Sequence, residues 1–212
     1  MFDIEYKGGN SIVVNGKKTQ VVVDPKLSLI GLKDLSAKDA VELATEARFA
    51  TNDPSAKLRV EGPGEYEIGE VSIKGVRAVR HLDVETDEPV ATMYRIEIGD
   101  VRMAILGNIA PKLHEDQLEE IGVVDILVIP VGGNGYTLDS VNATTVTRQI
   151  DPRVVIPVHY ADGALKYEVP QDDLDLFVKE LAAPVEEAGS KYKVKAPSSI
   201  PQVLTVIKID RS

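Results

Sequence analysis

Residues 104–160, with the three residues before them, constrain the fold of this chain more than any other stretch. They include three short runs rich in Val and Ile, bounded by Gly, Asn or Pro, at residues 101–106, 126–131 and 154–158. Two segments with helical spacing lie between these runs. Continuous apolar runs of this length are typical of parallel strands that are buried on both faces. The stretch is therefore expected to alternate strands with helices.

Each of the three runs is followed by a loop that holds chemically useful residues. Asn108 follows the first run, residues 132–136 follow the second, and His159 follows the third. In open α/β sheets, ligands bind beyond the carboxyl ends of the strands. A functional site is thus expected where these loops meet.

The rest of the chain is consistent with a single domain, residues 1–212, whose first half is rich in strands. Asn15 and Gly16 separate two β-branched runs, which is a strong signal for a hairpin. A capping-box-like opening predicts a short helix over residues 36–47, and the apolar spacing after Asp172 predicts another. No repeat or low-complexity linker divides the chain, and its length suits one domain.

Charge and composition exclude several functions. The formal net charge is -10, which disfavours nucleic acid as a partner because Lys and Arg drive binding to phosphates. The chain has no Cys, so a disulfide, a thiolate metal ligand and a catalytic thiol are all excluded. No apolar run approaches the roughly 20 residues that span a bilayer, and the N-terminus lacks a signal-peptide pattern. We expect a cytoplasmic protein without a membrane segment.

The chain has three histidines, His81, His114 and His159. His114 precedes two acidic residues at the start of an expected helix turn and is expected at the surface. His81 and Asp83 would share one face of an extended backbone, where they could hold a metal or only orient the imidazole. The spacing of this pair is not specific for a metal, which favours the structural interpretation. His159 directly follows an apolar run and is the best placed of the three.

The loop at residues 132–136 does not have the pattern of a phosphate-binding loop. It lacks the Lys-Ser/Thr ending of a P-loop and the spacing of a dinucleotide fingerprint. Asp139, the expected N-cap of the next helix, would put negative charge where an anion would sit. Gly133 and its neighbours are therefore interpreted as conformational, shaping a pocket beside Tyr136. A serine triad is not supported either, because no Ser lies in a G-x-S-x-G elbow.

Several segments resemble the metallo-β-lactamase fold superfamily, and specifically its branch of small stand-alone proteins often named Zn-dependent hydrolases of the β-lactamase fold. The most specific segments are ILGN at 105–108, VDILVIPVGG at 124–133 and VIPVHY at 155–160, with YKGGNS at 6–11 and VDP at 23–25 near the start. The resemblance covers most of the chain. It implies an α/β (α+β) fold, a four-layer αββα sandwich of two mixed β-sheets with outer helices.

Active members of that superfamily carry an H-x-H-x-D-H motif after an early strand, then a His, an Asp and a final His that together hold one or two zinc ions. The motif is expected near residues 49–56 here, yet no His occurs before His81. The bridging Asp is replaced by Asn108, a neutral amide that cannot supply a bridging carboxylate. The last ligand matches His159, and His81 is the candidate for the middle His.

We therefore expect a homologue of the metallo-β-lactamase-fold hydrolases that has lost the H-x-H-x-D-H motif and acts as a non-catalytic binding or interaction protein. This hypothesis includes no cofactor and no metal ligands, and its partner is an unknown small molecule or protein. The remnant of the pocket is expected to consist of His81, Asn108, Gly133, Tyr136 and His159.

Two alternatives remain open. In the first, the chain is a metal-dependent hydrolase in which His81, Asp83 and His159 hold one zinc ion, whose bound water is the nucleophile. Three such ligands are enough for a catalytic zinc. In the second, a metal-free catalyst uses Tyr136 or Asp139, for which the sequence offers no positive sign. Fold similarity alone cannot choose among these functions.

Overall fold

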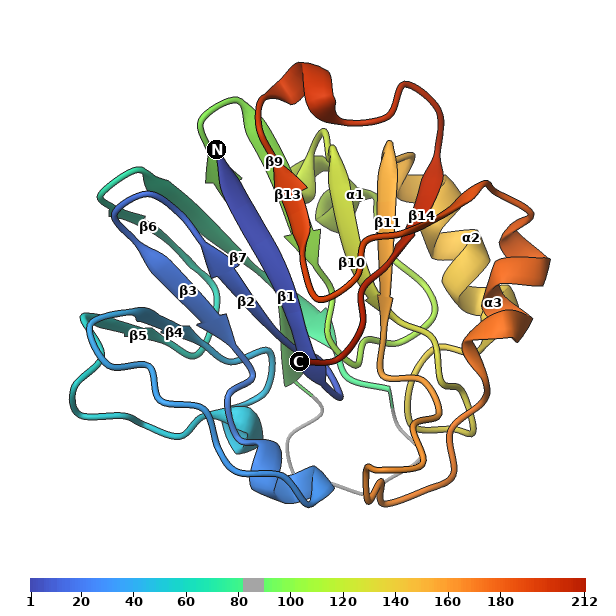
Figure 1. Ribbon diagram of the computed structural model, residues 1–212, viewed down its shortest axis with the longest axis horizontal. Helices are drawn as coiled ribbons and strands as arrows, with labels where there is room; N and C mark the ends of the chain where they lie inside the picture. Colours follow the sequence, from blue (N-terminus) through green and yellow to red (C-terminus); the bar gives the residue numbers. More distant parts are fainter. Residues whose placement is uncertain (82–89) are drawn as a thin grey trace.

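Two mixed β-sheets pack face to face in the computed structural model, which describes residues 1–81 and 90–212 (Figure 1). The first sheet is formed, in spatial order, by β13 (Tyr192–Val194), β1 (Phe2–Gly8), β2 (Ser11–Asn15), β3 (Gln20–Val23), β4 (Val41–Leu43) and β5 (Leu58–Val60). The second is formed by β12 (Val185–Glu187), β14 (Thr205–Lys208), β11 (Val154–Val158), β10 (Ile126–Pro130), β9 (Val101–Ile105), β8 (Val90–Ile98), β7 (Val71–Val79) and β6 (Gly64–Ile68).

The α-helices of the described residues cover the outer face of the second sheet, where α2 and α3 lie beside β11 and β14 (Figure 1). They are α1 (Glu115–Ile121), α2 (Ser140–Ile150) and α3 (Leu174–Leu181). The outer face of the first sheet is covered instead by a loop whose Ala37 and Ala40 pack on Val13 and Val22. The expected sandwich of two mixed sheets with outer helices is thereby confirmed. None of the helices in these ranges is long and apolar enough to cross a membrane.

The central strands of the second sheet explain the apolar runs of the sequence. β10 pairs in parallel with both β9 and β11, and every residue of β10 and β11 is buried. One face of these strands meets the core between the sheets, and the other meets the helices. The predicted alternation of strands and helices in this stretch is confirmed, as is the helix after Asp172, which is α3.

The helix predicted over residues 36–47 is wrong. Val41–Leu43 form strand β4, which pairs in parallel with β3 on one side and β5 on the other. Val41 and Leu43 are fully buried in the core between the sheets, so pairing with two neighbours outweighs the helical spacing of this segment. Glu42, also buried, accepts backbone N–H bonds from the loop at residues 51–53, which fixes the chain after the strand.

Tyr94 ties the two sheets together through its hydroxyl group. The residue lies on β8 of the second sheet and is fully buried. Its hydroxyl donates to the carbonyl oxygen of Ala44, next to β4 of the first sheet, at 2.9 Å. It also accepts the backbone N–H of Gly62 at 3.0 Å. Two backbone groups at the sheet junction therefore depend on this single oxygen.

We expect Tyr94→Phe to lower the free energy of unfolding by about 1–3 kcal/mol, because it leaves buried backbone groups without partners. Urea denaturation of the full chain measures this change. The matched control is Tyr192→Phe, because Tyr192 is also buried, at 7% exposed against 0% for Tyr94, and its hydroxyl makes no hydrogen bond within residues 1–81 and 90–212. Equal effects of the two substitutions would show that the hydroxyl does not join the sheets.

Candidate functional site

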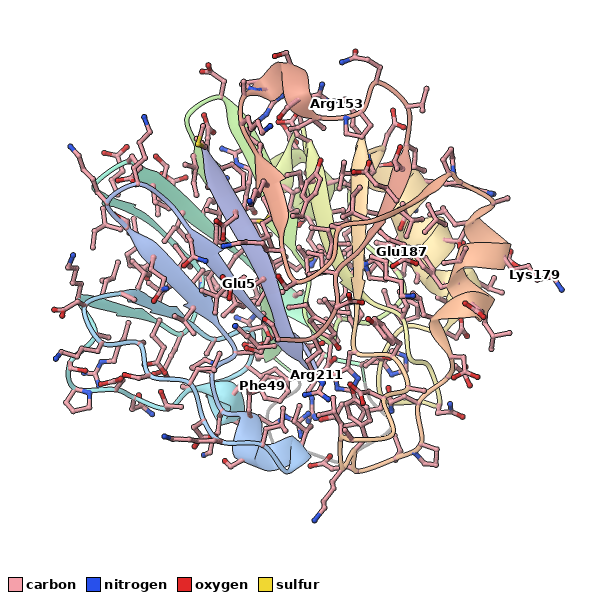
Figure 2. The ribbon with its side chains drawn as sticks, in the orientation of Figure 1. Glu5, Phe49, Arg153, Lys179, Glu187 and Arg211 are labelled. Atoms are coloured by element: carbon pink, nitrogen blue, oxygen red, sulfur yellow. The ribbon has the colours of Figure 1, made fainter. Side chains whose placement is uncertain are left out.

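A small cavity of about 30 Å³, room for roughly one water molecule, lies at the end of the sandwich where β1, β3 and β11 finish. Figure 2 shows Phe49, one of its lining residues, at the lower end of the molecule. The lining combines glycines, aliphatic and aromatic side chains with a few polar groups: Gly8, Gly9, Asn10, Asp24, Lys26, Leu27, Leu29, Ile30, Phe49, Tyr136, His159, Tyr167, Glu168 and Gln171. Of the five residues expected to form the pocket, Tyr136 and His159 line it directly.

His159 packs against two aromatic rings of this wall. Its ring centroid is 5.4 Å from that of Tyr136, with 25° between the planes, and 4.7 Å from that of Tyr167. The residue adopts a left-handed backbone conformation, with φ 53°, and its N–H donates to the carbonyl oxygen of Gly9 at 2.9 Å. A Cβ at Gly132 would lie 2.2 Å from the carbonyl oxygen of His159, so only glycine fits there.

The imidazole of His159 is held neutral. Burial lowers its pKa to about 4, and a hydrogen bond to Gln171 only partly opposes that shift. Its Nδ1 lies 3.0 Å from Oε1 of Gln171. The Gln171 amide nitrogen already donates to the carbonyl oxygens of Val169 and Pro170, so Oε1 must be the acceptor and Nδ1 carries the proton. In the neutral ring, Nε2 is then an acceptor.

A buried charge network lies next to the cavity and is centred on Glu46. The Nδ2 of Asn108 donates to Oε1 of Glu46 at 3.1 Å, and Nδ2 of Asn10 donates to Oδ1 of Asn108 at 3.0 Å. Arg80 pairs with Oε2 of Glu46 at 2.7 Å, although its Nε–H does not point at the oxygen. Arg48 pairs with the same oxygen at 3.1 Å. Burial raises the pKa of Glu46, and the two guanidinium groups oppose that rise.

Arg48 connects this network to the cavity wall. Its guanidinium group donates to the Tyr136 hydroxyl and lies 4.6 Å from the ring centroid of Phe49 and 5.2 Å from that of Tyr136. These distances fit cation–π contacts. The guanidinium group of Arg48, which is paired with Glu46, therefore fixes the position of Tyr136.

The other expected pocket residues lie around the network or outside it. His81 donates its backbone N–H to the carbonyl oxygen of Asn108 at 2.9 Å. Its Nδ1 is buried and has no partner among the described residues. Gly133, with φ 64°, shapes the turn before α2 and does not line the cavity, and His114 is exposed, as expected. Asp83 lies outside the described residues.

The side chains beside Asn108 and Tyr136 come from a segment that precedes residues 49–56, where the motif is expected. Of residues 49–56, only Phe49 lines the cavity. The side chains that reach Asn108 and Tyr136 come from Glu46 and Arg48, immediately after β4. They share the i, i+2 spacing of the first two histidines of H-x-H-x-D-H, which is the one signal in the sequence that points to this pair. Gly107 allows this approach, since a Cβ there would lie 2.6 Å from Cβ of Thr45.

Comparison with known proteins agrees with this architecture. Residues 3–159 match the family model described as a beta-lactamase superfamily domain. This chain belongs to the metallo-β-lactamase superfamily. The resemblance noted in the sequence is thereby confirmed.

The relatives found by sequence are named UPF0173 metal-dependent hydrolases. The protein from Salinibacter ruber is 26% identical over 143 residues, which cover 68% of this chain and 59% of the relative. The protein from Natranaerobius thermophilus is 34% identical over 80 residues, which cover 38% and 32%. The matched stretches thus span less than two thirds of these relatives.

Solved structures with the same fold cover nearly the whole chain. A candidate Zn-dependent hydrolase from Thermotoga maritima superposes with a TM-score of 0.76 at 24% identity, covering 99% of this chain and 100% of the other. Igni18, a metallo hydrolase from Ignicoccus hospitalis, superposes with a TM-score of 0.65 at 15% identity, covering 98% and 95%. These similarities show the fold.

The expectation of no cofactor is contradicted by these comparisons. The relatives are named metal-dependent hydrolases, so a metal ion is what the family implies. The side chains described here do not fit the family's zinc centre. Within residues 1–81 and 90–212, no three His, Asp or Glu side chains come close enough together to hold a metal. The carboxylate of Glu46, which accepts the hydrogen bond of Asn108, is already compensated by two guanidinium groups.

We expect Glu46→Gln to lower the free energy of unfolding by about 3–5 kcal/mol, because it leaves the guanidinium group of Arg80 buried without a compensating charge. Arg80 is only 3% exposed. The matched control is Glu168→Gln, which removes an exposed carboxylate 3.6 Å from Arg48 and should cost less than about 1 kcal/mol. Chemical denaturation compares the two variants, and equal losses would show that the network does not stabilise the fold.

We also expect acid to weaken the fold through His159. Its folded pKa, about 4, lies below the unfolded value, so the stabilisation it contributes is present above about pH 6.5 and is lost as the pH falls toward 4. The full effect is roughly 3 kcal/mol. His159→Asn, which tolerates the left-handed backbone, should remove this pH dependence between pH 7 and pH 4.5.

Asp24 also makes stability depend on pH. Its contribution is the same in wild type and in His159→Asn, so the difference between their free energies of unfolding reports the effect of His159. Burial raises the pKa of Asp24 to about 7, so its contribution is lost in the opposite direction, as the pH rises from about 4 to 7. Denaturation curves at several pH values provide the comparison. Parallel pH profiles for the two proteins would rule out a neutral buried imidazole.

Proposed function

We propose that this chain is a binding member of the metallo-β-lactamase superfamily, which binds a small molecule or a protein without catalysing hydrolysis. The observation that carries the proposal is the network of Glu46, Arg48, Arg80 and Asn108. It occupies the end of the sheets where the family gathers metal ligands, and its polar groups bond mainly to one another. Groups that are already paired in this way are not available to activate a water molecule.

The residues considered for metal-free catalysis are poorly suited to that role. Burial raises the pKa of Tyr136 to about 12, with Arg48 opposing the rise, so its hydroxyl is a weak nucleophile near neutral pH. Asp139 is exposed and caps α2, accepting the backbone N–H of Asn142 at 2.8 Å. These contacts favour structural roles for both residues.

We expect the full chain, with zinc supplied, to hydrolyse p-nitrophenyl acetate, bis(p-nitrophenyl) phosphate and nitrocefin no faster than the buffer does. Absorbance assays at several enzyme concentrations measure this rate. Hydrolysis that a chelator stops, that zinc restores, and that His159→Ala but not His114→Ala abolishes would overturn the proposal. It would favour instead the hydrolase in which His81, Asp83 and His159 hold one zinc ion.

A further inference from the structure

A groove of about 440 Å³ lies on the outer face of the first sheet, where it is lined by β13, the start of β1 and the hairpin between β2 and β3. It shares no lining residue with the cavity beside His159. Figure 1 marks the N-terminus in the upper part of the molecule, whereas Figure 2, in the same orientation, labels Phe49 of the cavity at the lower end. The groove is therefore a separate surface.

Three lysines form a row along one wall of this groove. They alternate along β13 with two residues that lie in the core between the sheets, Tyr192 and Val194. Because alternate side chains of a strand point to opposite faces, the lysines share the outer face and are spaced about 7 Å apart. They are Lys191, Lys193 and Lys195.

A fourth lysine, Lys17, faces the row from the other wall. Asp3 of β1 lies opposite Lys193 of β13 on one side and opposite Asn15 of β2 on the other. Because neighbouring strands are about 4.8 Å apart, Asn15 lies roughly 10 Å across the sheet from Lys193. Lys17 follows Asn15 in the hairpin turn and lines the same groove. Positive charge thus reaches the groove from both sides.

Most of this charge is not compensated within residues 1–81 and 90–212. Asp3, the acidic residue of the lining, pairs with Lys191 at 3.6 Å. Lys17, Lys193 and Lys195 are exposed and make no ion pair in these ranges. The groove therefore attracts anions, although the formal net charge of the chain is -10.

Protection of a sheet edge accounts for only part of this pattern. β13 is an edge strand of the first sheet, and lysines on an edge strand hinder pairing between copies. Lys17 lies beyond β2, in the interior of the strand order, where no edge needs protection. The approach of charges from two elements to one groove favours a binding role.

The spacing and the lining favour a polypeptide over nucleic acid. Single-stranded nucleic acid gains affinity when its bases stack on aromatic rings, and the aromatic ring in the lining, that of Phe2, is only 4% exposed. In an extended polypeptide, alternate side chains lie on one face about 7 Å apart, which is the spacing of the lysines on β13.

We propose that the groove docks an acidic segment of another protein in an extended conformation, and that its alternate Asp or Glu side chains pair with Lys193, Lys195 and Lys17. This interaction surface is distinct from the site beside His159, so the inference goes beyond the proposed function and does not rest on it.

The test compares two fluorescent peptides of equal composition, one with alternating acids (Glu-Thr-Glu-Thr-Glu) and one with adjacent acids (Glu-Glu-Glu-Thr-Thr). Fluorescence anisotropy measures their binding to the full chain at low ionic strength. We expect the alternating peptide to bind at least about threefold more tightly, because each of its acids meets a lysine. Its affinity should fall as NaCl is added, since exposed ion pairs are screened by salt.

Two variants locate the binding on the groove. Lys193→Glu combined with Lys195→Glu should weaken the alternating peptide at least about tenfold, because two attractions become repulsions. The matched control is Lys179→Glu, an exposed lysine on α3 that does not line the groove, and it should change the affinity less than about twofold. Lys17→Glu, on the other wall, provides a second variant if the double substitution impairs folding.

Several outcomes would overturn the inference. These are an absence of peptide binding at low ionic strength, equal affinity for the two peptides, and an equal loss of affinity in the control variant. Tighter binding of an oligothymidylate would assign the groove to nucleic acid. A dimer in analytical ultracentrifugation that Lys193→Glu abolishes would assign it to a second copy of the chain. The hydrolysis assays address the other site, so the failure of one proposal is distinguishable from the failure of the other.

Discussion

The carboxylate of Glu46 is the group on which this end of the molecule depends. Glu46 follows β4 of the first sheet, whereas its partners Arg80 and Asn108 follow β7 and β9 of the second. An isolated buried carboxylate would cost several kcal/mol, roughly the whole stability of a domain. Compensation by two guanidinium groups makes its burial tolerable. The same contacts fix Arg48 against Tyr136 and set the direction of the amide groups of Asn108 and Asn10.

The charges of the Glu46 network differ from those of the zinc centre that the family name implies. Zinc sites gather imidazole and carboxylate groups around a divalent cation. Near Asn108, positive charge is already supplied by Arg48 and Arg80, and the carboxylate of Glu46 is bound to both. The family relation implies a metal, while the described side chains do not fit its usual ligands. The fold itself matches that of the family.

The sequence was most informative where structure is determined locally. Fully buried parallel strands leave long apolar runs, so the elements around β10 and β11 could be predicted, and the position of His159 followed from them. The helix predicted over residues 36–47 was wrong because strand pairing outweighs its helical spacing. The partner strands, β3 and β5, lie outside this segment of the sequence. The network of Glu46 was missed for a related reason. Its members come from both sheets, and no spacing along the sequence brings Arg80 to Glu46.

The backbone at His159 also affects how a histidine at this place should be interpreted in other chains. The left-handed conformation of His159, its N–H bond to Gly9 and the close contact of its carbonyl oxygen with Gly132 are properties of the main chain. Few residue types tolerate such a backbone. Selection can therefore retain this histidine partly for its conformation, and its persistence among homologues would be weak support for metal chemistry.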